Sequence, residues 1–182
     1  MIVTIDREKK QLIVSDNGIG MTEDEVERYI TQIAFSGAEE FLEKYKEKSE
    51  ESAGIIGHFG LGFYSAFMVS DTVEIETLSY KEGAKPVHWV SAGEDSYEIE
   101  DGTRTEHGTT IIMNITEEEQ EFLQESRIRE ILHKYCQFMP YEIYLNPHDE
   151  ERPVYDKDGN IEKNEDGTEK KRIVKPLPIN DI

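Results

Sequence analysis

Two glycine-rich segments, one after a strand pattern and one before a helix pattern, constrain the fold of this chain more than any other feature. The first is Asp16-Asn17-Gly18-Ile19-Gly20-Met21, and it directly follows the apolar run at residues 11–14. The second is Gly57-His58-Phe59-Gly60-Leu61-Gly62-Phe63, and an apolar run of helical type continues from it. Glycines let the backbone turn sharply and approach another group closely. We therefore expect the two segments to border one pocket.

The charge of the chain limits the kind of partner that such a pocket can take. The 182 residues include 40 acidic and 20 basic ones, which gives a net charge of −20. A surface this acidic repels nucleic acid and anionic membranes, so we expect neither as a partner. Any phosphate group would have to be bound by backbone amides and helix ends, because a basic patch is missing from the sequence.

The remaining composition is typical of one domain in the cytoplasm. A length of 182 residues is enough for a domain with its own core. Cys136 is the single cysteine, so no internal disulfide can form, and that fits a reducing compartment. No apolar run approaches the roughly 20 residues of a membrane span. The first residues also lack the basic lead and apolar core of a signal peptide. We expect a cytoplasmic location.

Strand and helix patterns are mixed along the chain and do not alternate strictly. Thr22 and Glu25 have the spacing of a capping box, which predicts a helix start. The helix pattern at residues 60–69 is apolar nearly all round, which predicts that this helix is buried. Strands are expected at residues 2–5, 11–14, 72–78, 87–90, 97–99, 109–115 and 142–145, and further helices at residues 22–33, 41–45 and 117–138. Because several strands follow one another directly, we predict an α+β fold, a two-layer sandwich in which helices cover a mostly antiparallel sheet.

A change of composition near residue 146 indicates a domain boundary. Charged and turn residues dominate after this point, and Asp158-Gly159 predicts a small hairpin. We expect one domain at residues 1–146, followed at residues 147–182 by a charged linker that leads toward a further domain. The chain also begins inside a strand pattern, so we expect the domain to be incomplete at its N-terminus.

The first glycine segment has the chemistry of a purine site. Asp16 ends a strand, and an ionised carboxylate only accepts hydrogen bonds, whereas the exocyclic amine of adenine donates them. Gly18 and Gly20 leave room for a flat ring, and Met21 offers it a polarizable wall. An ordinary Asn-Gly turn with a solvated aspartate is the alternative at this point.

The second glycine segment favours phosphate. Its three glycines lead directly into a helix pattern, so backbone amides and the helix N-terminus would face an anion. The spacing is neither that of a P-loop nor that of the dinucleotide-binding fingerprint. A glycine-rich buried turn remains the alternative. The charged residues between the two segments are typical of a mobile lid, and Thr109 offers a hydroxyl to the same base.

Four stretches together resemble the ATP-binding domain of the ninety-kilodalton heat-shock chaperones, in the bacterial HtpG type. They are the two glycine segments, Ile33-Ala34-Phe35-Ser36-Gly37 and Gly108-Thr109, within a resemblance that covers about residues 2–146. The family belongs to the gyrase, chaperone, histidine kinase and MutL superfamily. The resemblance implies a Bergerat-type ATP-binding fold, ATP or ADP as ligand with Mg²⁺ in the complete protein, and a homodimeric, stress-responsive chaperone that assists folding of client proteins.

The resemblance also implies which residues contact the nucleotide. Asp16, Gly20 and Thr109 would hold the adenine amine and its water network, and the amides from His58 to Phe63 would embrace the phosphates, with residues 22–57 as lid. The expected ATP-binding residues are Asp16, Gly20, Met21, Ser36, Gly37, His58, Phe59, Gly60, Leu61, Gly62, Phe63 and Thr109. Trp89 is expected to be a core residue.

Three positions depart from the family pattern. Phe35 stands where the family has lysine, Ala38 where it has threonine, and His58 where it has glutamine. In the family, the catalytic glutamate and the magnesium-binding asparagine precede the segment that corresponds to residue 1. The resemblance therefore implies no catalytic residue and no metal ligand within this chain, and weak or absent binding by the chain alone. A non-enzymatic interaction module that no longer binds ATP is the alternative.

Overall fold

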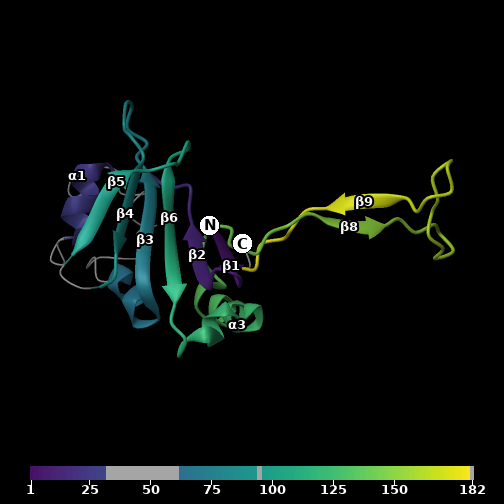
Figure 1. Cartoon of the computed structure of the whole chain (residues 1–182). Helices are drawn as coiled ribbons and strands as arrows, with labels where there is room; N and C mark the ends of the chain where they lie inside the picture. The colour runs from purple at the N-terminus through teal and green to yellow at the C-terminus, as the bar shows by residue number, and fades with distance from the viewer. Residues whose placement is uncertain (32–61, 94–95, 181–182) are drawn as a thin grey trace.

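A seven-stranded sheet forms the centre of the computed structural model, which describes residues 1–31, 62–93 and 96–180 (Figure 1). The strands are β1 (Ile2–Asp6), β2 (Gln11–Ser15), β3 (Ser70–Leu78), β4 (Val87–Ser91), β5 (Tyr97–Asp101), β6 (Gly108–Ile115) and β7 (Tyr144–Leu145). Their order across the sheet is β5-β4-β3-β6-β2-β1-β7. Neighbours are antiparallel except β1 and β7, which run parallel. The predicted α+β class with a mostly antiparallel sheet is confirmed.

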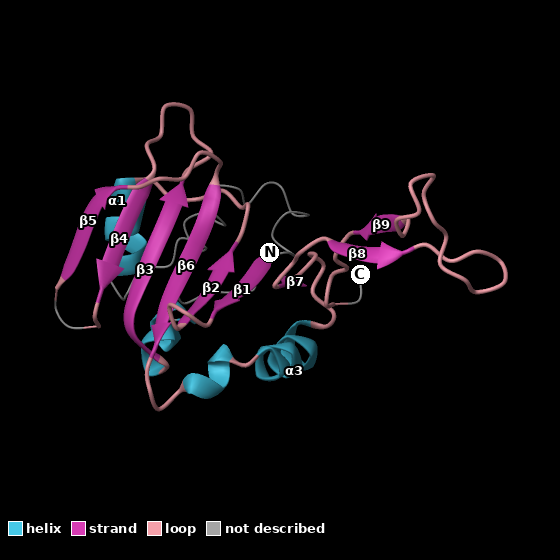
Figure 2. Ribbon diagram, turned by 45° about the vertical axis from the view of Figure 1, so that its right-hand side comes forward, coloured by secondary structure: helices cyan, strands magenta, loops and turns pink. Residues whose placement is uncertain are grey.

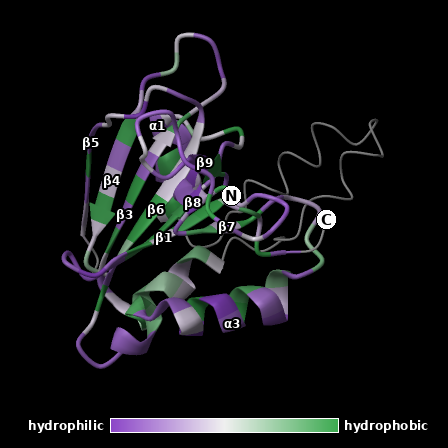
Figure 3. Ribbon diagram, turned by 90° about the vertical axis from the view of Figure 1, so that its right-hand side faces the viewer, coloured by the Kyte–Doolittle hydropathy of each residue, from purple (hydrophilic) through white to green (hydrophobic). Residues whose placement is uncertain are grey.

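The helices pack against one face of this sheet. Successive side chains of β3 alternate, so that Val73, Ile75 and Thr77 are fully buried on one face while Glu74 and Glu76 point to the other. The same alternation appears as hydrophobic and hydrophilic bands along β4 (Figure 3). Figure 2 shows the helix α1 (Glu23–Val26) behind β4 and β5, and α3 (Glu125–Cys136) near β1 and β2. A period of two therefore assigns each strand residue to the core or to solvent.

Two hydrophobic clusters lie side by side on the covered face. One joins α3 to β1 and β2, with Val3, Leu12, Ile115, Leu123, Ile128, Leu132 and Ile143 buried. The other joins α1 and the following π-helical turn (Glu27–Thr31) to β3 and β4, with Val26, Ile30, Ile75, Val87 and Trp89 buried. Trp89 is a core residue, as predicted.

The first helix starts as its sequence predicts. The Thr22 side chain accepts from the Glu25 backbone N–H, and the Glu25 carboxylate accepts from the Thr22 backbone N–H at 2.8 Å. Both halves of a capping box are thus present, and each satisfies a backbone donor that a helix start leaves free. The buried Val26 and Ile30 then anchor this segment on the sheet.

The prediction of a buried helix at residues 60–69 is wrong in its burial. The described part is a 3-10 helix, Gly62–Met68, none of whose residues is buried. Met68 is 79% exposed. A 3-10 helix has three residues per turn, so one narrow stripe faces the sheet, and the remaining apolar residues are left at the surface.

The single helix predicted at residues 117–138 is divided in two. A 3-10 turn, Gln120–Leu123, precedes α3, and Gln124 between them has an extended backbone with ψ of 123°. The break lets Leu123 and Ile128 enter the same cluster from two elements. Tyr135, on the outer side of α3, is 68% exposed.

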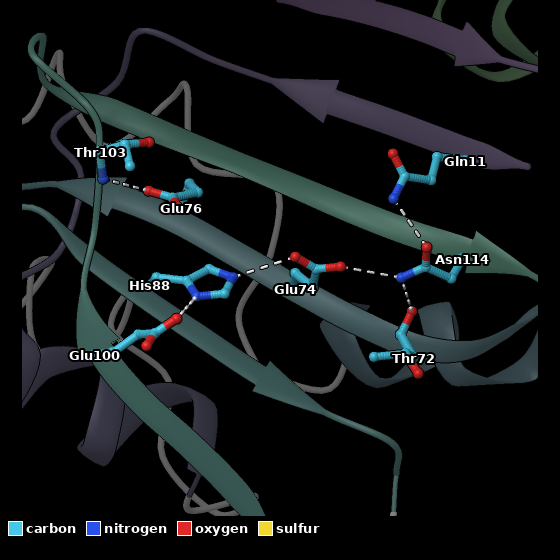
Figure 4. Close-up of polar contacts among 8 residues, drawn as sticks. All are labelled: Gln11, Thr72, Glu74, Glu76, His88, Glu100, Thr103 and Asn114. Carbon is cyan, nitrogen blue, oxygen red and sulfur yellow. Dashed lines mark hydrogen bonds and ion pairs between the residues drawn. The ribbon is translucent and has the colours of Figure 1, made fainter. Parts of the chain in front are cut away.

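The opposite face of the sheet carries a row of polar side chains (Figure 4). Gln11 donates to Asn114 Oδ1 at 2.9 Å, and Asn114 donates to Glu74 Oε1 at 3.1 Å. Glu74 Oε2 lies 3.2 Å from His88 Nε2, and His88 Nδ1 lies 3.0 Å from Glu100 Oε1. One line of hydrogen bonds therefore crosses five strands, from β2 to β5.

Residues after β7 form a two-stranded ribbon that extends away from the sheet (Figure 1). Its strands are β8 (Glu150–Pro153) and β9 (Lys171–Val174), which pair antiparallel. Beyond them, Val154, Glu162 and Lys170 form a closed triangle of backbone hydrogen bonds, each 2.8 or 2.9 Å long. A tight turn lies at Asp158-Gly159, as predicted, with Tyr155 bridged to Ile161.

The chain returns to the sheet after the ribbon. Ile179 N donates to Ile143 O at 2.7 Å. Ile179 also packs against the cluster that contains Val3 and Ile143, and Asn180 is hydrogen-bonded to Ile143. The predicted boundary between residues 146 and 147 stays a prediction. The predicted helix at residues 41–45 and most of the lid lie outside the described residues. In the part of the chain that the structure describes, no helix is long and apolar enough to cross a membrane.

Candidate functional site

Half of the predicted site residues lie in the described part of the chain. These are Asp16, Gly20, Met21, Gly62, Phe63 and Thr109. The others, Ser36, Gly37, His58, Phe59, Gly60 and Leu61, lie outside the described residues, as do Phe35 and Ala38. Asp16, Gly20, Met21 and Thr109 lie where β2 and β3 end and β6 begins. Gly62 and Phe63 instead open the 3-10 helix that precedes β3.

Asp16 directly follows β2 and is held by backbone groups. Its N–H donates to Thr109 O at 2.8 Å, which extends the pairing of β2 with β6 by one residue. Its carboxylate Oδ1 accepts from Gly18 N at 2.7 Å and from Thr109 N at 3.2 Å. Asp16 Oδ2 has no hydrogen-bond partner among the described residues, and the side chain is exposed. The carboxylate is therefore fixed by one oxygen and offers the other as an acceptor.

Gly20 lets the loop after Asp16 lie directly against the end of β3. Its φ is +61°, in the left-handed region that favours glycine. A Cβ at this position would lie 1.8 Å from Leu78 O, so no side chain fits there. Tyr80 N donates to Ile19 O at 2.8 Å and fastens the same approach.

Gly108 allows a second close approach, between the loop and the start of β6. A Cβ on Gly108 would lie 2.3 Å from Asp16 O. Arg104 reinforces the contact, because its Nη2 donates to Asp16 O at 3.1 Å and its Nη1 donates to Thr110 Oγ1 at 2.5 Å. Sequence reasoning missed Arg104, since a single arginine in a turn carries no distinctive pattern.

Thr77 on β3 is the second residue that sequence reasoning missed. It is completely buried, and its Oγ1 contacts Met21 N at 3.0 Å, Thr109 Oγ1 at 3.0 Å and Gly108 O at 3.2 Å. A signal existed in the strand pattern. The inward positions of β3 at Val73 and Ile75 are apolar, so a threonine at the next inward position needs buried polar partners.

Met21 and Phe63 form an apolar wall, and the Met21 backbone links it to the polar groups through Thr77. Both pack against the cluster that contains Ile75 and Trp89. The rings of Phe63 and Trp89 meet edge to face, with centroids 5.6 Å apart. Met21 and Phe63 are 42 positions apart in the sequence, and the fold brings both to one cluster. An apolar wall beside acceptor oxygens suits a flat ring that carries hydrogen-bond donors.

A separate hollow of about 350 Å³ lies between the start of α1 and the β3–β4 connection. It is lined by Thr22, Glu23, Asp24, Gly83, Ala84, Lys85, Pro86, Val87, Glu100 and Asp101. None of the predicted site residues borders it. We do not assign the nucleotide site to this hollow, because its lining includes four acidic residues and one basic residue, and this net negative charge would repel phosphate.

Comparison with known families identifies the chain. Residues 1–124 match the family described as histidine kinase-, DNA gyrase B-, and HSP90-like ATPase. The chain belongs to this family. Membership implies nucleotide binding. The observed fold, with helices on one face of a mostly antiparallel sheet, is consistent with this family. The resemblance to heat-shock chaperones drawn from the sequence is also supported by individual relatives.

Several curated relatives in this ATPase family are named chaperone protein HtpG. The protein of Porphyromonas gingivalis is 52% identical over 141 residues, which cover 78% of this chain and 20% of the relative. The protein of Bacteroides fragilis is 50% identical over 143 residues, 79% of this chain and 21% of the relative. That of Fusobacterium nucleatum is 38% identical over 172 residues, 92% of this chain and 28% of the relative. The matched part of the chain thus spans between about a fifth and somewhat more than a quarter of their length.

Proposed function

We propose that this chain, as the ATP-binding domain of an ATP-dependent chaperone, carries the site for ATP and ADP at the ends of β2, β3 and β6, and that it binds them only weakly by itself. The observation that carries the proposal is the carboxylate of Asp16. One of its oxygens is held by two backbone amides, and the other is an available acceptor beside Thr109. Such a fixed acceptor selects a purine that carries an amine, because an unmatched polar group costs about 1–3 kcal/mol on burial.

Each described residue has a role in this proposal. Asp16 accepts a hydrogen bond from the exocyclic amine of adenine, and Thr109 holds the same group directly or through water. Gly20 keeps the loop, and with it Asp16 and Met21, close to the end of β3, because a Cβ at this position would collide with Leu78 O. Met21 and Phe63 contact the faces of the ring with a polarizable thioether and an aromatic side chain.

The phosphates would be bound farther along the chain. The 3-10 helix begins at Gly62, the last glycine of the second segment. We propose that backbone amides from His58 to Phe63 bind the phosphates, with Ser36 and Gly37 at the lid. Backbone amides suit this task because the chain carries 40 acidic but only 20 basic residues, for a net charge of −20.

The chaperone part of the proposal rests on the printed name of the relatives. It includes unfolded or partly folded client proteins, a homodimer, Mg²⁺ bound with the nucleotide phosphates, and a cytoplasmic location. Nucleic acid and membranes are excluded from the proposal because of the acidic charge. Family membership disfavours the alternative of a non-enzymatic interaction module.

Isothermal titration calorimetry with ADP tests the proposal, in buffer with Mg²⁺ and in buffer with a chelator. Asp16→Asn keeps the size of the side chain and an oxygen for the Gly18 amide, but it replaces the free acceptor with a donor. We expect this change to lower the ADP affinity at least about tenfold, as loss of a hydrogen bond to a charged group does.

Asp71→Asn is the matched control, because Asp71 is an exposed aspartate at the opposite end of β3. It should bind ADP as the unmodified chain does. Equal affinity of the Asp16 variant and the unmodified chain would refute the role of Asp16. Absence of any heat with ADP or ATP at millimolar concentration would refute nucleotide binding by this chain.

A further inference from the structure

Thr77 joins three parts of the proposed site through a single hydroxyl. The residue is 0% exposed and lies in the middle of the sheet, where β3 runs next to β6. Its Oγ1 contacts the backbone N–H of Met21 in the loop, the hydroxyl of Thr109 and the carbonyl of Gly108. The residue thus contacts two residues that we assign to the nucleotide, although it is itself covered by protein.

The hydroxyl has one proton and two lone pairs, and this limits how the contacts are made. Met21 N–H can only donate, so it uses one lone pair of Thr77. The Gly108 carbonyl can only accept, so it takes the proton of Thr77. The remaining lone pair is then left for the Thr109 hydroxyl, which must donate its proton to Thr77. If Thr77 instead donated its only proton to Thr109, it would have none left for the Gly108 carbonyl, and that hydrogen bond would be lost.

This direction determines what Thr109 offers to a ligand. With its proton committed to Thr77, the Thr109 oxygen presents only lone pairs toward the pocket. The Asp16 carboxylate lies next to it, with Oδ1 occupied by the Gly18 and Thr109 amides and Oδ2 left as an acceptor. A ligand at this position would therefore meet two acceptor oxygens. An exocyclic amine at the purine 6-position donates to such a site, whereas a 6-oxo group cannot.

We propose that Thr77 is a positioning residue that sets the base preference of the site, by keeping the Thr109 hydroxyl an acceptor and by holding the Met21 amide in place. The inference rests on the proposed function, since it assumes that a purine occupies the pocket. A purely structural role for a buried threonine would change stability but not the preference between two purines. The ratio of two affinities is therefore the informative measurement.

The first experiment compares ADP with inosine diphosphate, which has a 6-oxo group, by calorimetry on the full chain. Thr77→Val keeps the shape of the side chain but releases the Thr109 proton to turn toward the ligand. We expect the preference for ADP over inosine diphosphate to fall about five- to tenfold, the effect of one hydrogen bond. Thr77→Ser retains the hydroxyl and should keep the preference of the unmodified chain.

Thr72→Val is a matched control on the other face of β3. Thr72 lies near the opposite end of the strand, and its backbone carbonyl, which accepts from Asn114, is kept in the variant. The change should leave the base preference unchanged. If Thr77→Val binds both nucleotides with the unmodified ratio, or if Thr72→Val lowers the ratio equally, the inference is wrong.

The second experiment needs no nucleotide. Amide hydrogen exchange at Met21 should be about tenfold faster in Thr77→Val than in the unmodified chain, because the amide loses its acceptor. Thr109→Val should leave Met21 protected but lower the base preference, which separates the two contacts and provides a second variant if Thr77→Val does not fold. Unchanged Met21 exchange in Thr77→Val overturns the inference, even if the unmodified chain binds neither nucleotide and the proposed function itself fails.

Discussion

Asn180 and Ile143 are joined side chain to backbone although 37 residues separate them. Asn180 Oδ1 accepts from Ile143 N at 2.9 Å, and Asn180 Nδ2 donates to Met139 O at 3.0 Å and to Tyr141 O at 2.8 Å. Asn180 is 5% exposed, and Ile143 is 1% exposed. One buried amide thus satisfies three backbone groups of the segment that leads into β7, and it fastens the returning chain to the sheet.

Replacement of Asn180 should destabilise the domain. Asn180→Ala leaves the Ile143 N–H and two carbonyls without this partner, so we expect the free energy of unfolding to fall by about 1–3 kcal/mol. Asn160→Ala, in the exposed part of the ribbon, is the control and should change it by less than about 0.5 kcal/mol. Urea unfolding followed by circular dichroism measures both. Equal effects of the two changes would show that the Asn180 contacts contribute nothing specific.

The ribbon itself should be dispensable for the fold of the sheet. Its strands pair with each other, and Asn180 joins the core only after the ribbon ends. Replacement of residues 150–174 by an Asn-Gly turn should therefore leave the melting temperature within about 2–4 °C of the unmodified chain, a change of no more than about 1 kcal/mol. The same replacement combined with Asn180→Ala should reproduce the loss caused by Asn180→Ala alone. A large drop from the ribbon replacement would instead assign a stabilising role to the ribbon.

Gly20 should not tolerate even an alanine. Both the positive φ and the 1.8 Å approach of a Cβ to Leu78 O oppose the change. Gly83 provides the matched control, because its φ is also positive, at +77°, but open space surrounds its Cβ position. We expect Gly83→Ala to cost about 1 kcal/mol of stability from backbone strain, and Gly20→Ala to cost clearly more and to reduce ADP binding. Thermal unfolding and calorimetry measure the two effects, and equal behaviour of both variants would contradict the role of the close approach.

His88 should make the stability of the domain depend on pH. Partial burial by itself would lower the pKa of His88, but hydrogen bonds to Glu100 and Glu74 and the charges of Glu76 and Glu74 raise it above the ordinary value of 6.5. The imidazolium is therefore favoured in the folded state. This contribution is complete below about pH 6.5 and is lost as the pH rises through the folded-state pKa.

The measurement is the free energy of unfolding between pH 6 and pH 9. Because the ion pairs are partly exposed, the decline with rising pH should be no more than about 1 kcal/mol. His88→Gln should flatten this part of the profile, and the exposed His133→Gln on α3 should keep the decline of the unmodified chain. A profile that rises with pH in this range would show that the sign of the His88 contribution is wrong.

Local sequence patterns predicted the elements that depend on neighbouring residues. The capping box of Thr22 and Glu25 and the first two strands were found in the predicted positions. The same patterns were insufficient where a longer element had to fit the sheet. Gln124 interrupts a continuous helical pattern because Leu123 and Ile128 must both reach one cluster, and that requirement is invisible in the periodicity.

The sequence by itself determined the strand faces, the acceptor at Asp16 and the acidic charge that leaves phosphate to backbone amides. Those properties follow from residue type and from periods of two and of about four residues. The tertiary structure decided which residues meet. The pairing of β3 with β6 brings Thr77 to Thr109, and Gly20 and Gly108 allow backbone approaches that any side chain would block. Contacts between distant parts of the chain depend on the register of the sheet, and no local pattern contains that register.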